Sequence, residues 1–153
     1  MNSYFQRVFE YDNWAKLKLA TAISTLPGVP ERVLSVYAHL LASNHIWQSR
    51  LLGVPAEMGV WEPIPLAKWF SQQATNHTQI ISYLDSVESS SFSEEINYKT
   101  TKGIPFQNTV EGILTHMITH SNYHMGQINL LLKAFLDPLP DLMYISYQRE
   151  QKS

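Results

Sequence analysis

The sequence predicts an all-α fold, an up-and-down four-helix bundle that forms a single domain over residues 1–153. Three observations support this prediction. Apolar residues recur at intervals of three and four over four long stretches, the spacing of amphipathic helices. Residues that end helices separate these stretches. With 44% hydrophobic residues, a chain of 153 residues is long enough to bury one sizeable core.

The first two helices are expected from Asn2 to about Leu26 and from Glu31 to about Leu52. Pro27 and Gly28 close the first helix, because neither residue favours its continuation. Pro30 suits the start of the second helix and Gly53 suits its end. These two helices carry four of the tryptophans and histidines discussed below, Trp14, His39, His45 and Trp47.

A connection rich in proline, Val54 to Pro65, precedes a third helix from about Leu66 to Val87. Apolar and polar residues then alternate between Phe92 and Gln107, on both sides of a Lys102-Gly103 turn. That alternation predicts a short β-hairpin-like excursion. The bundle therefore has a long crossover, containing this excursion, before its last helix.

The fourth helix is expected from a cap at Thr109 to about Leu136, where Pro138 and Pro140 prevent its continuation. Glu111 lies in its first turn, where a negative charge is favourable. The tail, Leu142 to Tyr147, is expected to form a brief helical turn.

Composition excludes several classes of function. The formal net charge is -2, so the chain lacks the basic surface expected of a nucleic-acid-binding protein. It has no cysteine, so any metal ion must be held by His, Asp or Glu. The N-terminus has neither a signal-peptide core nor a membrane-spanning segment, which predicts a cytoplasmic protein with no membrane partner.

Three histidines lie one helical turn apart in the predicted fourth helix: His116, His120 and His124. A spacing of four residues rotates a side chain by only about 40°, so neighbouring members can reach one ion. On a helical projection, His124 falls within the apolar arc, His120 at its edge and His116 outside it. The residues that define this arc are Ile113, Met117, Ile128, Leu131 and Phe135.

A metal site needs a further ligand from a facing helix, and the other histidines are His39, His45 and His77. His39 lies only at the margin of the apolar stripe of its helix, so periodicity does not choose among the three. A single histidine in a bundle is more often a surface or hydrogen-bonded core residue than a ligand. Spacing alone therefore leaves open both the third ligand and metal binding itself.

A resemblance to a known family bears on this choice. The segment from His120 to Ile128 reads His-Ser-Asn-Tyr-His-Met-Gly-Gln-Ile and resembles the final-helix motif of the DinB family. The segment from His39 to Trp47 is similar to the second-helix pattern of that family, and Tyr11 to Ala15 is similar to its first-helix pattern. The chain departs from the family pattern at Asn44, Tyr123 and Met125.

The resemblance implies a four-helix bundle, often a homodimer, in which His39, His120 and His124 bind one divalent metal ion. Three-histidine sites accept nickel, zinc, iron, copper or manganese, so the metal identity stays open. Three neutral ligands would leave coordination positions open for water or substrate.

Two functions are therefore expected as alternatives. The first is a metal-dependent enzyme acting on a small-molecule substrate, either a thiol-dependent S-transferase or a hydrolase, with His116 or Tyr123 as a proton shuttle. The low-molecular-weight thiol would be a co-substrate, because the chain has no cysteine. The second is a stress-related module that binds a metal or small ligand without catalysis. Its pocket could include Trp14, Trp47, Trp61 and Trp69, although aromatic residues at helical spacing are more often core.

Overall fold

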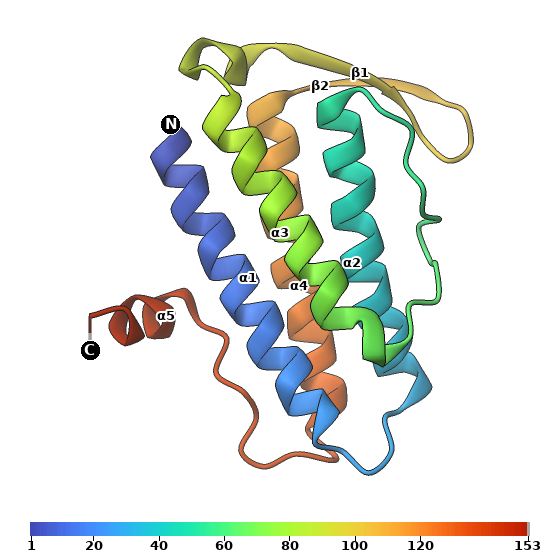
Figure 1. Cartoon of the computed structure of the whole chain (residues 1–153). Helices are drawn as coiled ribbons and strands as arrows, with labels where there is room; N and C mark the ends of the chain where they lie inside the picture. The colour runs from blue at the N-terminus through green and yellow to red at the C-terminus, as the bar shows by residue number, and fades with distance from the viewer. Residues whose placement is uncertain (153) are drawn as a thin grey trace.

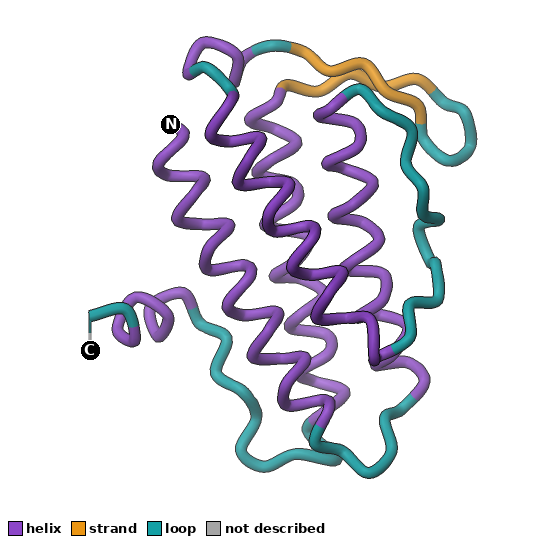
Figure 2. Tube along the Cα trace, viewed as in Figure 1, coloured by secondary structure: helices purple, strands orange, loops and turns teal. Residues whose placement is uncertain are grey.

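Four long helices run side by side in the computed structural model, which describes residues 1–152 (Figure 1). They are α1 (Asn2–Ser24), α2 (Glu31–Leu52), α3 (Trp69–Ser86) and α4 (Val110–Leu132). A hairpin of β1 (Glu95–Lys99) and β2 (Pro105–Thr109) crosses one end of the bundle, and α5 (Tyr144–Glu150) packs against α1 (Figure 2). The predicted four-helix bundle with a hairpin before its last long helix is confirmed.

The two helices that carry the proposed ligands are neighbours in the bundle. Helix α1 packs against α3 and α4, and α2 packs against the same two helices. The connection between α2 and α3 returns along the outside of the bundle, so α2 and α3 run in the same direction (Figure 1). This connection, Gly53 to Pro65, lies against α2, where Val60 contacts His39 and Glu57 contacts His45. It is a second crossover of the bundle, in addition to the one that carries the hairpin (Figure 1).

Local sequence signals explain where α2 and α4 begin and end. Gly53 closes α2 in the left-handed conformation, with φ of 68°, which glycine adopts without steric cost. Thr109 caps α4, because its hydroxyl oxygen accepts the backbone N–H of Gly112 at 3.1 Å. The bounds expected for α2 match those observed.

The core consists of two apolar clusters along the bundle. One contains Leu40, Leu41 and Ile128, together with Trp69, whose ring stacks on Tyr37 at a centroid distance of 4.0 Å. The other lies near the hairpin and includes Phe5 and Phe92. Both clusters hold residues of α1, α2, α3 and α4, so packing fixes the position of each helix relative to the others.

Several expected bounds need correction. Helix α1 ends at Ser24 rather than Leu26, and a 3₁₀ turn (Leu66–Lys68) precedes α3. Helix α4 ends at Leu132 rather than Leu136: residues 133–135 form a turn, and Phe135 is 53% exposed. Three other members of the predicted apolar arc, Ile113, Met117 and Ile128, are buried. Within residues 1–152, no helix is both long and apolar enough to cross a bilayer.

Candidate metal centre

Three imidazoles converge where α2 packs against α4. His39 comes from α2, and His120 and His124 come from successive turns of α4. One ring nitrogen of each residue can be chosen so that all three lie within 4.8 Å of one another. The helix spacing brings His120 and His124 to one face, and the packing of α2 on α4 adds His39.

The distances fit a shared ion. His39 Nε2 and His120 Nε2 lie 3.2 Å apart. An ion bound at about 2.0–2.1 Å from each nitrogen separates neighbouring ligand nitrogens by roughly 3–3.5 Å. The ring centroid of His124 is 4.4 Å from that of His120 and 4.8 Å from that of His39. The cluster could therefore hold one metal ion.

The connection between α2 and α3 fixes the orientation of His39. Its Nδ1 lies 2.8 Å from the backbone oxygen of Val60. A carbonyl oxygen only accepts hydrogen bonds, so Nδ1 must carry the proton and donate it. Nε2 is then left with a lone pair that faces His120, as metal coordination requires.

A side chain on α4 fixes the orientation of His124. The Nδ1 of His124 lies 2.7 Å from Oε1 of Gln127, one turn further along the helix. The amide oxygen accepts the Nδ1 proton, so Nε2 carries the lone pair. Histidines that ligate metals commonly donate their second ring N–H to such an acceptor. Two of the three histidines are thus held in the tautomer that binds a metal through Nε2.

Burial keeps two of the clustered histidines, His39 and His120, uncharged at neutral pH. Burial, together with the neighbouring His124 and His39, lowers the pKa of His120 to about 3. Burial also lowers the pKa of His39. Metal ions bind the neutral form of imidazole, so these shifts remove competition from protons at neutral pH.

A buried ion pair on α1 lies behind the cluster. Lys16 Nζ contacts Asp12 Oδ2 at 2.5 Å, and the Lys16 side chain is completely buried. The positive charge of Lys16 adds to the effects that lower the pKa of His120. Within residues 1–152, Asp12 Oδ1 has no hydrogen-bond partner. The pair places compensating charges beside the histidines inside the bundle.

The remaining histidines lie outside the cluster. His45 accepts a hydrogen bond from the backbone N–H of Glu57 at 3.2 Å, which ties the connection to α2. His77 lies 3.3 Å from a carboxylate oxygen of Glu10. Neither residue belongs to the cluster of His39, His120 and His124.

The two proton-shuttle candidates flank the cluster. The ring of His116 lies 5.4 Å from that of His120 and meets Trp47 edge-on at 4.8 Å. Burial and the charge of Arg50 lower the pKa of His116. Tyr123 is 64% exposed, and its ring contacts that of His124 at 5.0 Å. Both side chains are therefore close to a clustered histidine and accessible to solvent.

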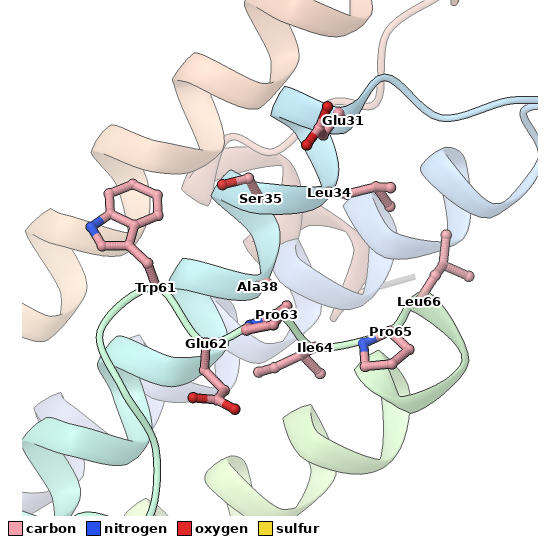
Figure 3. Close-up of a pocket in the computed structure, with 10 residues that line it drawn as sticks. All are labelled: Glu31, Leu34, Ser35, Ala38, Trp61, Glu62, Pro63, Ile64, Pro65 and Leu66. Atoms are coloured by element: carbon pink, nitrogen blue, oxygen red, sulfur yellow. The ribbon is translucent and has the colours of Figure 1, made fainter.

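A groove of about 380 Å³ adjoins the cluster between α2 and the connection (Figure 3). Trp61 connects the groove to the histidine cluster, because it lines the groove and stacks on His39 with ring centroids 4.0 Å apart. Leu34 and Ala38 of α2 and Pro63 and Ile64 of the connection supply much of its apolar lining. The three other tryptophans do not line this groove, and Trp69 is a core residue.

Sequence reasoning identified the three clustered histidines but did not identify their hydrogen-bond acceptors. Gln127 could have been found, because it lies three residues after His124 and hence on the same side of α4. Val60 could not have been found, since it contributes a backbone oxygen from a connection without a regular pattern. The burial of Asp12 and Lys16 was also missed.

Comparison with known proteins gives one match. The profile of the DinB family matches residues 1–150. Neither the curated proteins nor the solved structures give a match to this chain. The matched residues include all three clustered histidines and the connection that carries Trp61.

Proposed function

The chain belongs to the DinB family, and from that premise we propose that it is a metal-dependent enzyme of the thiol-dependent S-transferase or hydrolase type. His39, His120 and His124 hold one divalent ion in this proposal. The observation that carries it is the shared orientation of the imidazoles: the Nδ1 atoms of His39 and His124 face oxygen acceptors, which leaves each Nε2 free for a metal.

The proposed metal site is open: three protein ligands leave coordination positions for water or substrate, unlike a closed structural site. In the part of the chain that the structure describes, only three His, Asp or Glu residues group closely enough to share an ion here. His39 is buried, whereas His120 and His124 are partly exposed. When bound, the ion would act as a Lewis acid that polarises an oxygen or lowers the pKa of a thiol.

The chain's own residues would bind and orient the substrates. The apolar groove beside His39 suits an uncharged or apolar electrophile, because its charged lining residues, Glu31 and Glu62, would repel an anion. Trp61 would position that molecule against the histidines. The thiol must come from a co-substrate, because the chain has no cysteine.

We assign the proton-accepting role to His116 ahead of Tyr123. The lowered pKa of His116 keeps its imidazole neutral at pH 7, and the ring lies beside His120. A neutral imidazole can accept the proton of a thiol or of water at that pH, as general base catalysis requires. A phenol hydroxyl, such as that of Tyr123, is a weaker base than a neutral imidazole.

The proposal includes a homodimer. Apolar side chains remain exposed along α4 and just beyond it: Leu130 is 73% exposed and Phe135 is 53% exposed. Exposed apolar side chains favour association, and a twofold axis would pair the same face of two copies. Sedimentation analysis of the wild type and of a Leu130→Glu, Phe135→Glu variant tests this part, and a wild-type monomer would refute it.

A non-catalytic metal-binding protein is the second candidate. Within residues 1–152, none of the hydrogen bonds to the three clustered histidines comes from a carboxylate. A carboxylate is a common general base and a common partner of ligand histidines in enzymes. Its absence from the cluster favours a binding role over catalysis.

Turnover measurements separate these two functions. Protein loaded with nickel, zinc, iron or manganese would be incubated with a small thiol and an aromatic electrophile, and in parallel with an activated ester. Turnover that needs the metal, is lost in His124→Ala and is kept in His77→Ala would support the enzyme. One bound ion per chain without turnover of either substrate would support the binding module.

A further inference from the structure

A second pocket lies at the hairpin end of α2, away from the groove beside Trp61. It has a volume of about 330 Å³. The end of α2, the connection and the hairpin turn each contribute to its wall. The lining residues are Ile46, Ser49, Arg50, Val54, Ala56, Met58, Lys99, Thr100 and Thr101.

The charges in this pocket are all positive. Arg50 and Lys99 are its charged lining residues, and no carboxylate is among the residues that line it. In the described part of the chain, neither Arg50 nor Lys99 forms a salt bridge. Two cations without a carboxylate partner in a concave site attract an anion.

Arg50 is held in place by aromatic rings. Its guanidinium carbon lies 4.2 Å from the ring centre of Trp47 and 4.5 Å from that of Tyr98. Within residues 1–152, the only protein oxygen to which it donates is the backbone oxygen of Lys99, at a long 3.5 Å. Most of its five N–H donors are therefore free. Stacking on the two rings already restricts the side chain, so less motion is lost when an anion binds.

A hydroxyl group completes the polar side of the pocket. Thr100 Oγ1 accepts the backbone N–H groups of Lys102 and Ile104, at 3.3 and 3.2 Å. Because its oxygen accepts twice, its own proton is available to donate to a ligand. Thr101 adds a second hydroxyl to the lining.

The position of Arg50 also has a structural explanation, since a cation in the last turn of a helix stabilises its C-terminus. That effect needs only a charge near α2. It does not account for Lys99, which lies on β1, nor for a concave pocket between these two side chains. A ligand accounts for both.

We propose that this pocket binds the oxyanion of a small molecule, a carboxylate or a phosphate, between Arg50 and Lys99. The guanidinium would form paired hydrogen bonds with two oxygens of the anion, and the lysine would contribute a point charge. This site is independent of the proposed metal centre. It lies on the same side of the bundle, because Trp47 contacts both Arg50 and His116.

An NMR titration tests the proposal directly. Inorganic phosphate and glutarate would each be added to ¹⁵N-labelled protein at constant ionic strength, while the amides of Thr100 and Thr101 and the Arg50 Nε–H are followed. Saturable shifts of these signals with either anion are expected. The tighter-binding anion identifies the ligand class.

Variants show whether the two cations are responsible. Arg50→Gln and Lys99→Gln are each expected to weaken binding by about tenfold or more. Lys102→Gln is the matched control, because Lys102 belongs to the same turn but does not line the pocket, and it should change affinity by less than about twofold. Lys99→Gln changes an exposed side chain, so it also tests the site if Arg50→Gln fails to fold.

Three results would overturn the proposal: no saturation by either anion, affinity unchanged in Lys99→Gln, or an equal loss in Lys102→Gln. Binding should also persist in His124→Ala. Persistence there would separate this site from the metal centre, so that failure of one proposal leaves the other standing.

Discussion

Replacing Gln127 by alanine tests the link between the helix geometry and metal binding. Gln127 accepts the Nδ1 proton of His124 at 2.7 Å, and this contact fixes the tautomer that presents Nε2 to the ion. Loss of such a hydrogen-bond partner typically lowers metal affinity by about 10- to 100-fold. That loss corresponds to roughly 1.4–2.7 kcal/mol of binding free energy.

The assay is competition with a chromophoric chelator at fixed pH, using one divalent metal throughout. Gln127→Glu is the matched variant, because its carboxylate keeps an acceptor at the same position and should preserve the affinity or increase it. Thr119→Ala, a change at an exposed position of the same helix, should have no effect. An affinity of Gln127→Ala within about twofold of the wild type would refute the role assigned to this residue.

Three further predictions concern charge, pH and the groove. Asp12→Ala should destabilise the protein by about 3–5 kcal/mol in urea unfolding, because it leaves Lys16 buried without its partner; a loss below about 1 kcal/mol would contradict this. In metal-free protein the pKa of His120 is about 3, below its value in the unfolded chain, so unfolding takes up a proton between about pH 6.5 and pH 3. The contribution of His120 to the free energy of unfolding should therefore be complete above pH 6.5 and fall as the pH is lowered, by at most about 1.4 kcal/mol per pH unit and less where solvent screens the ring. Equal free energies of unfolding at pH 7.5 and 5.5 would contradict this pKa shift. Trp61→Ala should raise KM for an apolar electrophile by about tenfold while kcat stays nearly constant, because Trp61 lines the groove; an unchanged KM would remove the groove from the substrate site.

The fold was largely predictable because its boundaries depend on local chemistry. Pro30 and Gly53 delimit α2, and the Thr109 cap starts α4; each acts within one or two turns. The end of α4 was mispredicted for a physical reason. Phe135 continues its apolar pattern, but its side chain is 53% exposed and contributes little to the core. Periodicity cannot distinguish an apolar residue in the core from one on the surface.

The site was predictable only in part. The spacing of His120 and His124 indicated a shared face of one helix, but the choice of His39 came from family resemblance rather than from periodicity. The contact of His39 with Val60 joins a helix to an irregular connection, and no pattern in the sequence encodes such a pairing. The Asp12–Lys16 pair has the spacing of an ordinary surface ion pair, so its burial depends on how α1 packs in the bundle.

The metal content of gently purified, untagged protein shows whether the three clustered histidines bind an ion. The wild type, His39→Ala, His124→Ala and the controls His45→Ala and His77→Ala would be compared by elemental analysis, with helicity checked by circular dichroism. About one divalent ion per chain in the wild type and both controls, and loss of the ion in His39→Ala and His124→Ala, is the predicted result. A folded wild type that neither retains nor takes up a divalent ion would refute the proposed metal site, as would loss of the ion in either control.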